Sequence, residues 1–182
     1  MVLTQSPQKH IFYHADRDAS LKEGQEIILD ENGLSKFGNV YWPVIQATQI
    51  EDMNSAQQRE YYLEYIKREP RYSLYSSRLQ SFFGANTIDE AVVFANSIDP
   101  RPNHPIPIFE ILSNWYWTLD SNWLDFIPGP DRMTNYYNYW EGKISNHSPI
   151  EGERRPPRLE VLIALPATAG KIVHAVDLRL GL

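Results

Sequence analysis

The sequence contains no cysteine among its 182 residues. Without thiols the chain has no disulfide bond, no zinc–thiolate site and no cysteine nucleophile, and its redox compartment stays open. No stretch approaches the roughly 18 consecutive apolar residues of a membrane-spanning helix, so we expect no membrane segment. Residues 1–9 lack a basic start followed by an apolar run. We therefore expect a cytoplasmic protein, or one delivered into a target cell without a signal peptide.

An excess of positive charge is also missing, since the formal net charge is −6. This balance argues against a large non-specific nucleic-acid surface, although it allows a local basic patch. The five histidines show no metal-ligand spacing. No glycine-rich phosphate-binding loop of the P-loop or dinucleotide type occurs. The sequence therefore predicts no metal site and no nucleotide site of those two types.

Aromatic residues are the unusual component of the chain. They make up 13% of the sequence, with 11 tyrosines and 5 tryptophans. Some must fill the core, and the rest suit a groove that stacks on planar rings, because Tyr and Trp combine an apolar face with a polar handle. The length favours a single domain over residues 1–182, and 42% hydrophobic with 22% charged residues is typical of a globular one.

Two helices have start signals in the sequence. Asn54 is a candidate N-cap for an amphipathic helix over residues 54–69, which ends before Pro70. The capping box Thr87–Glu90 predicts a second helix over residues 88–96. Shorter helical segments are expected at residues 16–22 and 120–126.

Strand patterns outnumber these helices and do not alternate with them. The strands are expected at residues 10–14, 74–85 (strand or strand plus loop), 108–118, 159–165 and 171–178. Loops are expected at residues 99–107, 128–130, 151–157 and 166–170. Because no βαβ alternation is present, we predict an α+β fold built on a mixed, mainly antiparallel sheet.

Two strands carry a polar residue that a simple core would not select. Glu160 shares a strand face with Leu162, so its carboxylate lies either at a solvated strand edge or at the mouth of a cleft. His14 ends an apolar strand, where a lone histidine is more often structural. Strand ends are nevertheless common places for functional sites, because a rigid element holds the side chain.

Residues 77–81 form a third unusual segment, dense in hydrogen-bond donors. Arg78 is a candidate phosphate ligand because its planar fork suits bidentate contacts, and an ordinary surface ion pair is an equal alternative. Phe83 and Phe94, which follow, are most simply core aromatics.

Taken in order, these segments resemble the His–Tyr–Glu arrangement of the ADP-ribosyltransferases of the poly-ADP-ribose-polymerase type. The resemblance consists of His14 on the first strand, residues 81–85 before a capped helix that carries Ala91 and Phe94, and Glu160 on a late strand followed by another strand. The motifs Ser77-Arg78 and Tyr139-Trp140-Glu141-Gly142 are also similar to those of a bacterial family of unassigned function that is thought to share this fold.

The resemblance implies a split sheet with an NAD cleft flanked by helices. It implies a mono-ADP-ribosyltransferase that uses NAD as its substrate and needs no metal. Glu160 would stabilise the oxocarbenium-like state and hold a ribose hydroxyl, while His14 would bind the adenosine-side ribose. The other NAD contacts implied are Tyr13 or Phe94 stacked on nicotinamide, the Ala15 backbone on its carboxamide, Phe83 at the aromatic position of the triad, and Arg17 and Arg78 facing the diphosphate.

This sequence departs from the family pattern at four positions. Ala15 stands where glycine usually follows the histidine, and Phe83 or Phe82 stands in place of the triad tyrosine. Ala91 replaces the small polar residue of the helix. Arg158 occupies the position at which arginine-modifying relatives carry a second acid, so modification of arginine is disfavoured.

The acceptor is expected to be a macromolecule, either a protein or a single-stranded nucleic acid. Exposed aromatics are expected at residues 114–117 and 136–140, and Arg154, Arg155 and Arg158 form a basic loop or an ordinary solvated one. The resemblance implies a bacterial toxin, effector or defence protein, with a neutralising partner if it is a toxin. The alternatives are a catalytically inactive binding module of the same fold and, less favoured, a hydrolase using His14 and Glu160.

Overall fold

The computed structural model describes residues 9–125, 130–145 and 156–177. Two antiparallel sheets form its centre, which confirms the α+β class and the mainly antiparallel pairing. The first sheet has the strand order β1 (His10–Ala15), β4 (Ile106–Ser113), β7 (Ala167–Val176) and β2 (Glu26–Ile27). The second sheet has the order β3 (Ser81–Gly84), β6 (Leu159–Ala164) and β5 (Tyr116–Asp120).

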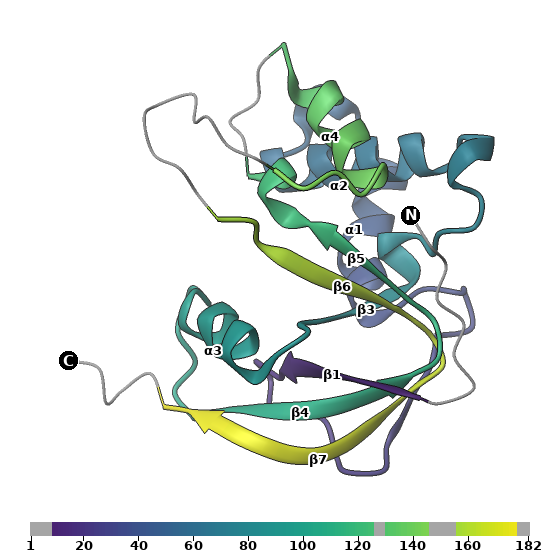
Figure 1. Ribbon diagram of the computed structural model, residues 1–182. Coiled ribbons are helices and arrows are strands. Elements are labelled where there is room, and N and C mark those ends of the chain that lie inside the picture. The colour runs from purple at the N-terminus through teal and green to yellow at the C-terminus, as the bar shows by residue number, and fades with distance from the viewer. Residues whose placement is uncertain (1–8, 126–129, 146–155, 178–182) are drawn as a thin grey trace.

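The two sheets meet where β1 lies beside the end of β3. The Tyr13 amide donates to the Ala85 carbonyl at 3.0 Å, and the Ala85 amide donates to the Tyr13 carbonyl at 2.8 Å. Figure 1 shows the sheets converging on one side of the molecule and separating on the other. As a result β1, β3 and β6, which carry the three segments singled out from the sequence, occupy successive places across the junction.

Four α-helices surround the sheets in the described residues. They are α1 (Lys36–Ala47), α2 (Ser55–Lys67), α3 (Ile88–Asn96) and α4 (Arg132–Trp140), with short 3-10 turns at Ile50–Asp52, Pro70–Tyr72, Arg78–Gln80 and Ser121–Leu124. Asn54 caps α2 and Thr87 caps α3, as predicted. Both caps are reciprocal capping boxes, of which only the one at Thr87 is predicted from the sequence. Figure 1 places α2 and α4 over the second sheet and α3 in the opening between the sheets. No helix of the described residues is long and apolar enough to cross a membrane.

The core consists of three apolar clusters that follow from these layers. The cluster between the second sheet and helices α2 and α4 includes Leu63, Ile66, Leu119, Tyr139, Trp140 and Leu162. The cluster between the two sheets includes Phe12, Phe109, Ile111, Val161 and Ile163. The cluster under α3 includes Ala15, Ala85, Ala91, Ala95, Ile106 and Ile108. Alternate residues of β6 therefore belong to different clusters.

Several sequence expectations are wrong at the element boundaries. The single strand expected over 108–118 breaks after Ser113, and its halves join different sheets as β4 and β5. Residues 16–22 form no helix, because the Asp16 carboxylate instead accepts the backbone amides of Ser20 and Leu21. The loops expected over 99–107 and 166–170 are partly strand. Most of the loops expected at 128–130 and 151–157 lie outside the described residues.

Helix α1 was not predicted, because Gly38 and Pro43 lie inside it and both disfavour helix. Ser35 caps the helix by accepting the Gly38 amide. Gly38 packs against the backbone that follows Arg78, where an added Cβ would lie 2.1 Å from the Leu79 carbonyl oxygen. This close approach explains why a poor helix former is used in the first turn of α1.

We predict that Gly38→Ala destabilises the protein by about 1–3 kcal/mol, because the new methyl group would collide with the backbone of Leu79. The free energy of unfolding in urea measures the effect. Val40→Ala, an exposed substitution in the same helix, serves as the control and should change stability by less than about 0.5 kcal/mol. Equal stability of Gly38→Ala and the wild type would contradict the packing described.

Candidate functional site

Glu160 lies in a hydrogen-bonded ion-pair cluster beneath α2 and α4. Its Oε1 atom accepts from the Tyr139 hydroxyl at 2.6 Å and from Arg78 Nη1. Arg78 Nη1 also donates to the Tyr139 oxygen at 2.5 Å, which closes a triangle of three polar groups. The Glu160 side chain keeps 20% of its surface exposed, and no described residue forms a hydrogen bond with its Oε2 atom.

Arg78 is held from the opposite side by Glu60 of α2. Its Nε atom donates to Glu60 Oε2 at 2.9 Å, and the two side chains are only 6% and 1% exposed. The second Glu60 oxygen accepts from Arg59 Nε at 2.9 Å. Because two carboxylates and two guanidinium groups alternate, the buried charges balance. We call Glu60, Arg78, Tyr139 and Glu160 the Arg78 network.

Aromatic rings enclose the guanidinium of Arg78. Its central carbon lies 4.9 Å from the ring centroid of Phe83, 5.3 Å from Tyr139 and 5.7 Å from Phe37. Such contacts stabilise a cation that is removed from water. They fix the guanidinium plane without occupying its hydrogen-bond donors.

Burial and neighbouring charges together set the protonation states of Arg78 and Tyr139. Burial opposes the charged form of Arg78, but the carboxylates of Glu160 and Glu60 outweigh it and raise the pKa well above the usual value. Burial likewise raises the pKa of the Tyr139 phenol well above the usual value. Tyr139 therefore remains protonated and donates its hydrogen to Glu160, while Arg78 remains a cation.

The local structure of α2 and of the turn before β3 places Glu60 and Arg78 in the network. Glu60 lies three residues before Leu63, so its side chain is on the buried face of α2. Ser77 begins the turn that presents Arg78, by accepting the Leu79 amide at 3.1 Å. Glu60 was missed in the sequence, although its place in the apolar spacing of the helix was a signal for a buried acid.

Asp120 fixes the chain just before the start of β6 and was also missed. It is fully buried, and one of its oxygens accepts the amides of Asn122 and Arg158 at 3.0 and 3.1 Å. The other oxygen accepts the amide and the hydroxyl of Ser145 at 2.7 and 2.5 Å. Since Arg158 is two residues from Glu160, these bonds also limit how far the carboxylate can shift.

His14 contacts β3 rather than the network. Its Nδ1 atom lies 2.7 Å from the Phe83 carbonyl oxygen, and its ring centroid lies 4.3 Å from that of Phe82. A carbonyl oxygen only accepts, so Nδ1 carries the hydrogen and Nε2 is the acceptor of the neutral ring. Burial lowers the pKa of His14, while the bond to Phe83 acts in the opposite direction. The ring is therefore neutral at pH 7.

Strand alternation places His14 and Glu160 against different faces of the second sheet. Along β6, Val161 packs between the sheets, whereas Leu162 packs with the residues of α2 and α4. Glu160 shares the Leu162 face. His14 contacts Phe82, which packs with the cluster between the sheets. Both polar residues thus border β3, but from opposite sides.

The other residues predicted for NAD binding are distributed around this junction. The structure brings Arg78, Phe83 and Glu160 together, and the Phe83 carbonyl is also the partner of His14. Ala15 is buried under α3 with Tyr13 beside it. The remaining two residues lie on the surface, where Arg17 donates to the Pro100 carbonyl at 3.3 Å and the Phe94 side chain is 58% exposed.

The expected exposed aromatics are mostly buried, which corrects that prediction. Trp117 of β5 and the buried residues Tyr136, Tyr139 and Trp140 of α4 belong to the core cluster beneath α2 and α4. Trp115 keeps 37% of its surface exposed. Arg158 of the expected basic loop pairs with Asp125 at 2.6 Å. Arg154 and Arg155 lie outside the described residues.

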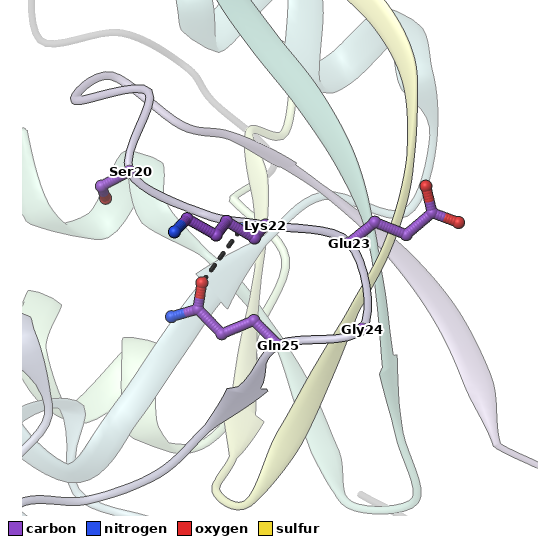
Figure 2. Close-up of a pocket in the computed structure, with 5 residues that line it drawn as sticks. All are labelled: Ser20, Lys22, Glu23, Gly24 and Gln25. Atoms are coloured by element: carbon purple, nitrogen blue, oxygen red, sulfur yellow. Dashed lines mark hydrogen bonds between the residues drawn. The ribbon is translucent and has the colours of Figure 1, made fainter.

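Two surface depressions lie near the loop between β1 and α1. The first is open and is formed by the turn that Figure 2 shows, in which the Lys22 amide donates to the Gln25 side chain at 3.0 Å. The second has a mixed lining of apolar side chains, including Phe82 and Leu21, and polar ones, including Glu26 and Lys36. Because Phe82 also contacts His14, this second depression adjoins the histidine. Glu160 lines neither depression.

Within the described part of the chain, no group of three His, Asp or Glu side chains is arranged to hold a metal ion. No protein-family model and no curated protein matches the sequence. The assignment of a function therefore depends on the chemistry of the groups that the fold brings together.

The balance of charge in the Arg78 network predicts a large effect on stability. Arg78→Met should lower the free energy of unfolding by about 3–5 kcal/mol, because it leaves the buried carboxylate of Glu60 and the partly exposed one of Glu160 without their shared cation. Urea denaturation measures the loss. Arg68→Met, which breaks an exposed pair with Glu64, should cost less than about 1 kcal/mol. Similar losses for the two variants would show that the network contributes no special stability.

The lowered pKa of His14 predicts that the protein loses stability in acid. The unfolded chain binds a proton near the usual pKa of about 6.5, above the pKa of the folded state. This contribution is therefore fully present above that pH and is lost as the pH falls below it. Stability measured at pH 7.5 and 5.5 should fall less in His14→Asn than in the wild type. The exposed His174→Asn should retain the wild-type difference, and an unchanged slope in His14→Asn would refute the prediction.

Proposed function

We propose that this protein is an NAD-dependent mono-ADP-ribosyltransferase that modifies a macromolecular acceptor, with Glu160 beside the ribose that carries nicotinamide. The observation that carries the proposal is the state of this carboxylate. One of its oxygens is fixed by two donors, while the other has no partner among the described residues and the side chain is partly exposed. A fixed, accessible carboxylate suits the stabilisation of a positive charge that develops in a substrate.

The arrangement of strands supports the same function. The segments that resemble the family motifs are far apart in the sequence, yet they lie on β1, β3 and β6, which are neighbours across the junction of the sheets. Phe83 lies on the same side of the second sheet as Glu160, since it packs against the cluster that contains Leu162. Phe94 on α3 is exposed enough to stack on a planar ring.

The proposed reaction breaks the bond between the ribose C1′ atom and the pyridine nitrogen of NAD. Nicotinamide leaves with the electron pair of that bond, and C1′ develops oxocarbenium character. Glu160 stabilises this charge, and a lone pair of the acceptor then forms the new bond to C1′ as the acceptor gives up a proton. His14 offers Nε2 as an acceptor for a ribose hydroxyl, and the exposed Arg17 offers a cation to the diphosphate.

One observation favours a second candidate, a catalytically inactive binding module. Glu60, Arg78 and Tyr139 of the Arg78 network are buried, and Glu160 accepts two hydrogen bonds from within the network. His14 and Glu160 also face opposite sides of β3. A protein that used this cluster only as an internal brace would recognise a partner through other surfaces and would not consume NAD.

Turnover of NAD distinguishes the two candidates. We expect the purified protein to release nicotinamide from NAD and to transfer labelled ADP-ribose to a protein or nucleic acid in a cell lysate. Glu160→Gln should lower the rate by about 100-fold or more, because it removes the charge that stabilises the transition state. Chromatography measures the nicotinamide released. The label that remains on protein and on nucleic acid measures the transfer of ADP-ribose.

Glu110→Gln is the matched control, because Glu110 also lies on a strand with a side chain 20% exposed and paired with a cation, Lys171. It should leave turnover within about twofold of the wild type. Absence of NAD consumption by the folded wild type in the presence of lysate would refute the enzyme and favour the binding module. The same variant pair, expressed in bacteria, reports whether growth arrest depends on Glu160, as expected for a toxin that a partner neutralises.

A further inference from the structure

We propose that Arg78 and Tyr139 are positioning residues, which hold Glu160 through one oxygen and leave the other for the substrate. This inference depends on the function proposed above and assigns Arg78 a place other than the NAD diphosphate. The reason is its surroundings, since the guanidinium is buried and its hydrogen-bond partners are Glu60, Glu160 and Tyr139.

The donors converge on a single atom of Glu160. Arg78 Nη1 and the Tyr139 hydroxyl both reach Oε1, so rotation of the carboxylate would break two bonds at once. Oε2 has no partner among the residues that the structure describes. A carboxylate restrained in this way presents a defined oxygen to a ligand, which is the requirement for charge stabilisation without reorganisation.

The restraint is itself anchored at three points. Glu60 of α2 holds Arg78 through Nε, while Nη1 of the same guanidinium reaches α4 and β6. One planar group therefore spans three elements, and a lysine ammonium cannot supply donors at two such separated points. The close packing of Gly38 against Leu79 keeps α1 tight on the turn that carries Arg78.

Tyr139 supplies the most specific test, because Phe retains its ring and removes only the hydroxyl. Tyr139→Phe should lower kcat for NAD turnover about 10-fold and leave KM for NAD within about twofold, since the lost hydrogen bond acts on a charged group used in the transition state. Tyr137→Phe is the matched control. It lies in the same helix and loses a comparable bond to a different acid, Glu69, so we expect wild-type kinetics.

A double-variant cycle separates positioning from a general structural role. Because Tyr139 acts through Glu160, adding Tyr139→Phe to Glu160→Gln should lower kcat by less than about twofold further. An equal 10-fold loss in both backgrounds would overturn the inference, and so would wild-type kcat in Tyr139→Phe alone. If Tyr139→Phe does not fold, Arg78→Lys is measured in the same cycle, with the same non-additivity expected.

The outcome also shows which proposal fails. A wild-type protein that does not consume NAD refutes the proposed function and this inference with it. A wild-type protein that consumes NAD, together with additive effects of Tyr139→Phe and Glu160→Gln, leaves the proposed function intact and refutes the positioning role alone.

Discussion

The packing of α2 and α4 on the second sheet depends on the buried guanidinium of Arg78. This guanidinium joins the acid of α2 to the acid of β6 and to the phenol of α4, so three elements meet through one planar group. Removing a cation from water is costly unless every donor is used and the charge is matched. Glu60 and Glu160 supply the opposite charge for Arg78, and its Nε and Nη1 atoms donate to these acids and to Tyr139. These bonds tie α2 and α4 to the second sheet at this place.

The junction of the two sheets provides the second constraint. The paired hydrogen bonds between Tyr13 and Ala85 place β1 beside β3, while β6 lies on the other side of β3. His14 also donates a hydrogen bond to the carbonyl of Phe83, the residue of β3 whose ring lies against the Arg78 guanidinium. The backbone of Phe83 thus contacts one polar group and its ring contacts the other, on opposite sides of the strand.

Local signals in the sequence predicted local structure well. The N-cap candidate Asn54 and the capping box at Thr87 predicted the starts of α2 and α3, because caps depend on residues three positions apart. The break after Ser113 was missed because its cause is long-range, since the two halves pair with different partners, β7 and β6. The polar residues on β1, β3 and β6 were recognisable as unusual, whereas the partnership of Arg78 with Glu60 depends on packing between distant segments.

The energetics of buried ion pairs bear on what the network is for. Well-packed apolar side chains often stabilise a core as much as a buried ion pair or more, so stability alone does not explain its presence. A buried ion pair can also favour one unique packing arrangement, but Glu60 and Arg78 would be sufficient for that purpose. The network instead extends to Glu160, whose side chain reaches the surface with one oxygen unused among the described residues. A cluster built only to brace the core would end inside it, whereas this one ends on an accessible carboxylate, which favours a role for that oxygen in binding or chemistry.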